Sequence, residues 1–193
     1  RADHLRLVQA ALDWHGGLDS YVNCAGVSSW RPLAEIDEAF WSSMMDTNAA
    51  GAFWGCQAAA AVMKTGASLI NLSSLAGKRG SANNSAYCAS KFALNGITQS
   101  LAKELGPRGI RVNAVCPVYV ETPMILESLK DPRSPAGGKD VQTYLKEFTR
   151  GNTALLRLPQ AKEVAAACLF LASEGASAIT GQCINVDCGV LPQ

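Results

Sequence analysis

The sequence predicts an α/β fold in which helices cover both faces of a parallel β-sheet. Short apolar runs alternate with longer stretches of helical periodicity, and glycine or proline separates many of them. Hydrophobic residues make up 48% of the chain and charged residues 17%, a balance that favours a packed core over disorder. The length of 193 residues fits one domain, so we expect residues 1–193 to fold as a unit.

The individual elements follow from these patterns. Short runs with an apolar centre predict four strands, at residues 18–23, 67–72, 110–116 and 182–186. Apolar residues at helical spacing predict four helices, at residues 3–14, 37–64, 86–105 and 159–173. Residues 121–150 contain several prolines and a Gly-Gly pair, so we expect one or two short helices around a mobile turn there.

Charge and cysteine content narrow the class of protein. The net charge of +1 provides no basic surface for nucleic acid, and no apolar run reaches membrane-spanning length. The seven cysteines are an odd number and lie mostly in apolar runs, which is typical of reduced thiols in a cytoplasmic protein. The only histidines, His4 and His15, lie far from every polar cluster, so we expect no metal site.

The strongest chemical signal is the pair Tyr87 and Lys91. They are four residues apart near the start of a predicted helix, so their side chains share one face. A free tyrosine has a pKa of about 10 and is a poor base at neutral pH, but a nearby cation favours its phenolate form. The pair is therefore a candidate acid–base couple, although a solvated tyrosine and a surface lysine would show the same spacing.

Ser74 adds a second group to this candidate site. It follows the predicted strand 67–72 directly, and ligands of open α/β sheets bind at the carboxyl ends of the strands. A serine hydroxyl in that place can donate to a carbonyl oxygen and stabilise charge that develops on it. The alternative is a serine that only forms a turn.

These residues and several further motifs resemble the short-chain dehydrogenase/reductase family, in the family's order along nearly the whole chain. The further motifs are Asn23-Cys24-Ala25-Gly26, Asp46-Thr47-Asn48, Arg111 to Pro117, Glu121 to Met124 and Thr180 to Asp187. The resemblance, which includes 3-oxoacyl-carrier-protein reductases and polyol dehydrogenases, implies a Rossmann-like doubly wound parallel sheet. It also implies hydride transfer between NAD or NADP and a secondary alcohol or ketone.

The resemblance further implies roles for single residues. Tyr87 would transfer the proton on the substrate oxygen and Ser74 would orient that oxygen. Lys91 would hold the ribose hydroxyls and lower the pKa of Tyr87, and Asn48 would position a water at a helix kink. The cofactor-binding positions carried over from the family are Asn23, Cys24, Ala25, Gly26, Tyr87, Lys91, Pro117, Val118, Val120 and Thr122.

Two of these positions depart from the family's pattern. Cys24 replaces an asparagine in a turn that acts largely through its backbone, so we expect the change to be tolerated. Val118 replaces a glycine that follows the proline, and its branched side chain would crowd the nicotinamide. We therefore expect either a reshaped substrate pocket or reduced activity.

The family's glycine-rich phosphate-binding turn does not occur in this sequence. By the resemblance, the sheet lacks its first three strands, and residues 18–23 form an exposed apolar edge. The leading hypothesis is a fragment of a longer enzyme. The alternative is a catalytically inactive truncated reductase that serves as a scaffold or interaction protein.

Substrate and partners are less defined by the sequence. Asn83 and Asn84 precede Tyr87, and two amides there would suit a hydroxyl-rich substrate such as a polyol or sugar. A 3-oxoacyl thioester is the other candidate, because carrier-protein reductases share these motifs. The resemblance also implies a homotetramer or a dimer, with helices 37–64 and 86–105 at the interface.

Overall fold

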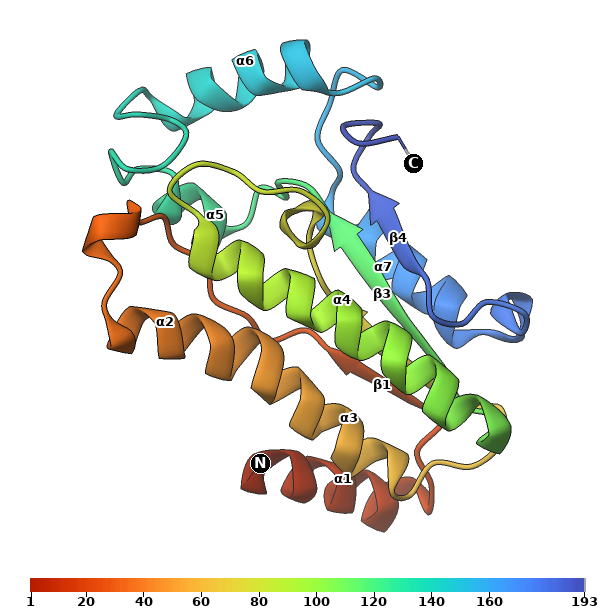
Figure 1. Ribbon diagram of the computed structural model, residues 1–193. Coiled ribbons are helices and arrows are strands. Elements are labelled where there is room, and N and C mark those ends of the chain that lie inside the picture. The colour runs from red at the N-terminus through yellow and green to blue at the C-terminus, as the bar shows by residue number, and fades with distance from the viewer. Residues whose placement is uncertain (193) are drawn as a thin grey trace.

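The computed structural model describes residues 1–192 and confirms the predicted α/β class. Its sheet contains the strands β1 (Ser20–Asn23), β2 (Ser68–Leu72), β3 (Arg111–Pro117) and β4 (Cys183–Val186). The strands lie in the order β1-β2-β3-β4, and every neighbouring pair is parallel (Figure 1). Parallel neighbours need crossover connections, and helices supply each of them.

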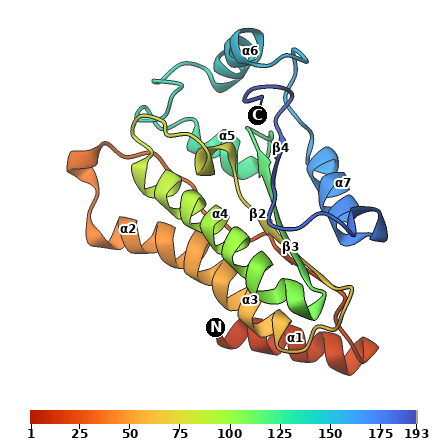
Figure 2. The same cartoon turned by 45° about the vertical axis from the view of Figure 1, so that its right-hand side comes forward.

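Helices form a layer on each face of this sheet (Figures 1 and 2). One face is covered by α1 (Ala2–His15), α3 (Ala52–Ala60) and α4 (Ser85–Leu105), and the other by α7 (Ala161–Ala172). Adjacent residues of β2 point to opposite faces, so Leu69 packs in the first core and Ile70 in the second. The result is a sheet whose central strands are buried on both sides.

The stretch predicted as one long helix over residues 37–64 is helical but not uniform. It consists of α2 (Glu38–Met45), a π-helical segment η2 (Asp46–Gly51) and then α3, which ends at Ala60. Asp37 caps α2 by accepting a hydrogen bond from the Phe40 backbone N–H (2.7 Å). Wide π-helical turns occur often at functional sites, and this one contains Asn48.

The insertion over residues 121–150 forms two helices, as predicted. These are α5 (Pro123–Ser128) and α6 (Val141–Asn152), and α6 continues two residues beyond the predicted limit. A separate apolar cluster of Trp30, Leu129 and Leu145 fixes the insertion against the loop that follows β1. This segment therefore closes one side of the space above the sheet.

Single turns of 3-10 helix complete the fold, at η1 (Leu33–Glu35), η3 (Leu75–Gly77), η4 (Gly106–Arg108) and η5 (Glu174–Ala176). Within the described residues β1 is an edge strand, and it is four residues long instead of the six predicted. Its Val22 is 45% exposed, so the edge is apolar at that point. Over residues 1–192, no helix combines the length and apolar character needed to cross a membrane.

Candidate active site

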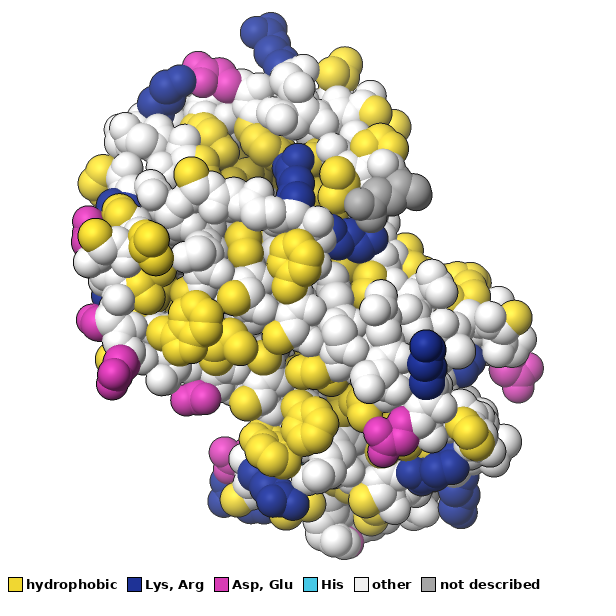
Figure 3. Space-filling view, in the orientation of Figure 1, with side chains coloured by type: hydrophobic (Ala, Val, Ile, Leu, Met, Phe, Trp, Pro, Cys, Tyr) yellow, Lys and Arg dark blue, Asp and Glu magenta, His cyan; other side chains and the backbone are white. Residues whose placement is uncertain are grey.

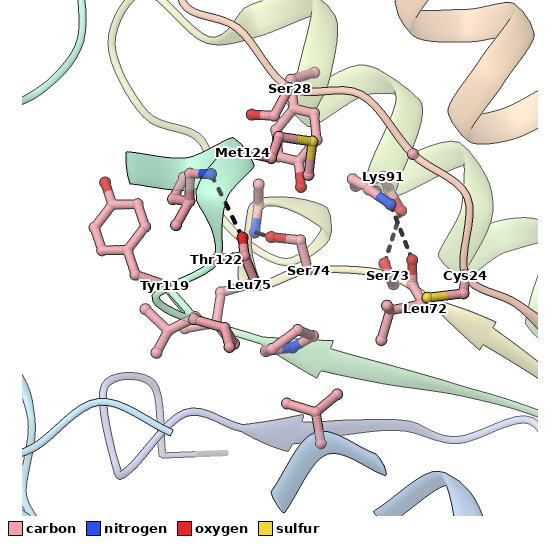
Figure 4. A pocket seen from close by; sticks show the side chains of 18 of the residues that line it. Cys24, Ser28, Leu72, Ser73, Ser74, Leu75, Lys91, Tyr119, Thr122 and Met124 are labelled. Carbon is pink, nitrogen blue, oxygen red and sulfur yellow. Dashed lines mark hydrogen bonds between the residues drawn. The ribbon is translucent and has the colours of Figure 1, made fainter. Parts of the chain in front are cut away.

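The carboxyl ends of β1, β2 and β3 open into one cavity of about 730 Å³. Cys24, Ser74 and Pro117, which lie at or just beyond these three strand ends, all line it. Figure 4 shows Ser74, Lys91 and Thr122 around this pocket. The position is the one expected for ligand binding in an open parallel sheet.

Ser74 is held at the cavity by the turn that follows β2. Its Oγ accepts a hydrogen bond from the Ala76 backbone N–H (3.1 Å) and so caps η3. Gly77 ends that turn against α4, since a Cβ added there would lie 2.7 Å from the Lys91 backbone oxygen. This close approach joins the turn that carries Ser74 to the helix that carries Tyr87.

Tyr87 and Lys91 lie in the first two turns of α4, and both line the cavity. The Lys91 Nζ is 5.8 Å from the centre of the Tyr87 ring and donates a hydrogen bond to the Leu72 carbonyl oxygen (2.9 Å). Lys91 is only 5% exposed, and burial lowers its pKa to about 8. The structure therefore brings the predicted pair together, with the buried amine of Lys91 beside the phenol of Tyr87.

The pKa of Tyr87 differs from the expectation drawn from the sequence. Burial raises the pKa of Tyr87, and its hydrogen bond with Ser74 lowers that pKa only in part. The pKa of Tyr87 therefore rises, whereas the sequence predicted that Lys91 would lower it. The reason is that desolvation of the phenolate outweighs the hydrogen bond from Ser74 that stabilises it. Tyr87 is thus neutral at neutral pH and suited to donate a proton.

Asn48 lies behind the cavity wall and is 1% exposed. Its Oδ1 accepts from the Val27 backbone N–H (2.8 Å), and its Nδ2 donates to the Val27 carbonyl oxygen (2.9 Å) and to Ser90 Oγ (3.0 Å). Both amide hydrogens are therefore engaged within the protein. The structure gives Asn48 a positioning role, in which it fixes the loop after β1 against α4, while its predicted role in a water relay stays a prediction.

Most of the predicted cofactor-binding residues share the cavity wall. Those that line it are Cys24, Gly26, Tyr87, Lys91, Pro117, Val118, Val120 and Thr122. Asn23 and Ala25 are not among the lining residues, and their cofactor-binding role stays a prediction. The Asn23 amide instead donates to Asn71 Oδ1 (2.8 Å) and to Cys56 Sγ (3.3 Å), because its side chain points toward the helical layer that packs on β1.

The asparagine pair before Tyr87 divides in the structure. Asn84 is buried and lines the cavity, whereas Asn83 is exposed and donates to the Arg133 carbonyl oxygen (3.1 Å). Asn83 has a positive φ of 56°, a left-handed conformation that asparagine adopts more readily than most residues. The cavity wall also contains residues that the sequence did not single out, including Trp30 and Phe148.

Comparisons with known proteins show the family to which the chain belongs. Residues 1–191 match the family model described as enoyl-(acyl carrier protein) reductase. The chain belongs to the short-chain dehydrogenase/reductase family. It is therefore an oxidoreductase of that family, and its cofactor is NAD or NADP.

Individual relatives carry reductase and dehydrogenase names. The chain is 36% identical to a diacetyl reductase [(S)-acetoin forming] of Staphylococcus aureus over 98% of its own length and 74% of that protein. It is also 36% identical to a 3-oxoacyl-[acyl-carrier-protein] reductase of Chlamydia trachomatis, over 95% of its own length and 69% of that protein. The chain also resembles a crystal structure described as a short-chain dehydrogenase/reductase, glucose/ribitol dehydrogenase, from Brucella melitensis. The two structures superimpose with a TM-score of 0.88 at 35% sequence identity, over 100% of this chain and 73% of that one.

The cavity wall offers a hydrogen-bond donor that fits the ribose of the cofactor. An ammonium group has three donors, and the protein engages Lys91 Nζ through the one hydrogen bond to Leu72, which leaves donors for ribose hydroxyls. Gly26 lies close against Asn48 and Lys91, since a Cβ there would lie 3.2 Å from Asn48 Oδ1 and 3.7 Å from Lys91 Nζ. Lys91 would thus be able to hold the ribose hydroxyls of the cofactor.

Val118 lines the cavity in place of the family's glycine, and the cavity still measures about 730 Å³. This volume lies within the range of small-molecule sites. All seven cysteines of the chain are free in the structure. Among residues 1–192 no group of three or more histidine, cysteine or acidic side chains is placed to hold a metal ion.

Proposed function

We propose that this protein interconverts a secondary alcohol and a ketone, with NAD or NADP as the hydride carrier. The observation that carries the proposal is the arrangement of Ser74, Tyr87 and Lys91 in one cavity wall at the carboxyl end of the sheet. Their order and spacing are those of the family's catalytic serine, tyrosine and lysine. The alternative of an inactive scaffold provides no reason for a buried amine beside a half-buried phenol.

Each residue contributes a distinct step to the proton transfer. The substrate oxygen lies between the Ser74 hydroxyl, which polarises it, and the Tyr87 hydroxyl, which donates the proton during reduction. The cofactor, when bound, supplies the hydride in one direction and accepts it in the other. Lys91 holds the ribose and, as a cation, stabilises the Tyr87 oxygen after the proton has left.

The cavity wall favours a substrate with apolar groups around the reacting carbon. Val27, Met124, Ile125 and Phe148 line the space that Ser74 and Tyr87 also line. A fully hydroxylated sugar would lose hydrogen bonds to water against these side chains. The names of the relatives, a diacetyl reductase and a 3-oxoacyl reductase, support a short ketone or a 3-oxoacyl thioester over a sugar.

A second copy of this chain is the proposed partner, through the helical face formed by α2, α3 and α4. Hydrophobic side chains gather on this face in Figure 3, and Trp41 and Phe92 are 45% and 48% exposed. Large exposed aromatic side chains on one face mark protein interfaces. Phe92→Glu is expected to shift the sedimentation coefficient to that of a smaller species. Leu155→Glu lies outside this face and should leave the coefficient unchanged. An unchanged sedimentation coefficient for Phe92→Glu would contradict the proposal.

The function is tested by titrating the purified protein with NADH and NADPH by calorimetry and then measuring ketone reduction. Tyr87→Phe is expected to retain cofactor affinity and lose reduction by about 100-fold or more, since only the proton donor is removed. Tyr21→Phe removes a phenol hydroxyl that contacts His4, away from the cavity, and is the matched control. Equal reduction by Tyr87→Phe and the wild type would refute the proposed role.

A further inference from the structure

The hydroxyl of Ser90 joins the helix that carries Tyr87 to the asparagine of the π-helical segment. Ser90 lies near the start of α4 and is 0% exposed. Its Oγ accepts a hydrogen bond from Asn48 Nδ2 (3.0 Å) and donates one to the Tyr87 carbonyl oxygen (2.7 Å). A serine hydroxyl has a single hydrogen to donate, so the bond to Tyr87 leaves Ser90 able only to accept from Asn48.

This bond bears on how the Asn48 amide faces the loop after β1. Val27 presents its backbone N–H to Asn48 Oδ1 (2.8 Å) and its carbonyl oxygen to Asn48 Nδ2 (2.9 Å). The same Nδ2 also donates to Ser90. Rotation of the amide by half a turn would place its oxygen against two acceptors and its NH2 group against the Val27 N–H. Ser90 therefore adds a contact that only one orientation of the amide satisfies.

The orientation of Asn48 matters to the cavity because part of the wall rests on it. Gly26 and Val27 both line the cavity, whereas Asn48 and Ser90 lie behind it. A Cβ added to Gly26 would lie 3.2 Å from Asn48 Oδ1, so the wall packs closely on that amide. Val27 and Tyr87 pack against the same apolar cluster. A displaced Asn48 amide would therefore disturb the side of the cavity that supports Tyr87.

The same arrangement occurs a second time on α4, at a distance from the cavity. Thr98 is also 0% exposed, and its hydroxyl accepts from Asn71 Nδ2 (2.9 Å) and donates to the Leu94 carbonyl oxygen (2.8 Å). Thr98, Asn71 and Leu94 lie outside the cavity wall. The two bridges are chemically alike and should contribute alike to stability, but only the Ser90 bridge ends at the proposed proton donor.

We infer that Ser90 is a positioning residue for the proton transfer, because it holds the Asn48 amide in the orientation that Val27 requires. Ser90 does not line the cavity, so it acts through Asn48 and Val27 and not on the substrate. The inference rests on the proposed alcohol–ketone interconversion and adds a residue to it. A role limited to stability would change unfolding alone, whereas a positioning role also changes kcat.

The kinetic test removes one hydroxyl from each bridge. Ser90→Ala is expected to lower kcat for ketone reduction by about 10-fold, with KM and cofactor affinity changed by less than about 2-fold, since the lost bond lies behind the wall. Thr98→Val is the matched control, expected to lower the melting temperature to a similar extent and to keep the kcat of the wild type. An unchanged kcat in Ser90→Ala, or an equal loss in Thr98→Val, would overturn the inference.

A double-mutant cycle shows whether Ser90 acts through Asn48. In a protein that already carries Asn48→Ala, the further change Ser90→Ala is expected to have little effect on kcat, because the bond between the two side chains is already lost. Independent effects of the two substitutions on kcat would overturn the inference.

Hydrogen exchange tests the same contact without turnover. The Val27 backbone N–H is expected to exchange about 10-fold faster in Ser90→Ala than in the wild type, and at the wild-type rate in Thr98→Val. An unchanged Val27 rate in Ser90→Ala would overturn the inference. A wild type that reduces no ketone would instead refute the proposed function, and the Val27 rates would still decide whether Ser90 holds Asn48.

Discussion

The buried amine of Lys91 should destabilise the folded protein at neutral pH. Burial lowers its pKa from the ordinary 10.5 to about 8, because the charged form is removed from water. A tenfold change in proton affinity is worth about 1.4 kcal/mol, so keeping Lys91 charged in the fold at pH 7 costs about 3 kcal/mol. Lys91→Met keeps most of the length of the side chain and removes this cost.

The net effect includes the hydrogen bond that the substitution also removes. Lys91 Nζ donates to the Leu72 carbonyl oxygen, and loss of that bond costs about 1–2 kcal/mol. We therefore expect Lys91→Met to raise the free energy of unfolding at pH 7 by about 1–2 kcal/mol while it impairs ketone reduction. Between pH 8 and pH 10.5 the unfolded chain binds more protons at Lys91 than the folded one. The wild type therefore gains stability as the pH rises through this window, and the variant loses its advantage.

Urea denaturation at pH 7 and at about pH 10 measures both effects, since the transition gives the free energy of unfolding directly. Lys103→Met is the control, because Lys103 is exposed on the same helix and its substitution should show no such dependence on pH. The reasoning is refuted if Lys91→Met is less stable than the wild type at pH 7. A stability difference that is the same at both pH values would refute it as well.

Three further outcomes follow from the geometry of the site. Gly77→Ala should lower the free energy of unfolding by about 1–3 kcal/mol, because its Cβ meets the α4 backbone at 2.7 Å, whereas Gly80→Ala, with open space around it, should not; thermal melting compares them. Asn48→Leu should lower the free energy of unfolding by about 2–4 kcal/mol and reduce kcat, since it leaves the Val27 backbone N–H and carbonyl oxygen unpaired. A variant that folds and has the kcat of the wild type would contradict this prediction. The raised pKa of Tyr87 predicts that alcohol oxidation accelerates with pH and that ketone reduction slows only in alkaline buffer, which initial rates at a series of pH values will check.

The sequence predicted the strands and helices well because local signals mark their ends. Gly16 ends α1 in a left-handed conformation, and Gly66 makes the turn before β2 with a φ of 94°. The break in the long helix was not visible, because Asp46 to Gly51 has the composition of an ordinary helix. The π-helical turn contains Asn48, which is hydrogen-bonded to the Val27 backbone. A contact between residues so far apart in the chain cannot be read from the local sequence pattern.

The site was predictable only in part, because some of its residues are placed by tertiary contacts that leave no local signal in the sequence. Ser74, Tyr87 and Lys91 follow from strand ends and helical spacing, and the structure brings them to one wall. The direction of the Asn23 side chain depends on which sheet face the helical layer covers, so its contact with Asn71 could not be read locally. Trp30 reaches the cavity through packing against Leu129 and Leu145, about a hundred residues away, where the sequence shows only an apolar loop residue.

The central claim is that Tyr87 donates the proton while the nicotinamide transfers a hydride to the same ketone. The most direct measurement supplies a reduced cofactor that carries deuterium at its transferable position and follows the label into the alcohol by mass spectrometry. The account predicts one deuterium on the carbinol carbon with the wild type, and loss of labelled product with Tyr87→Phe at unchanged cofactor affinity. Labelled alcohol formed equally by both proteins, or alcohol without deuterium, would contradict it.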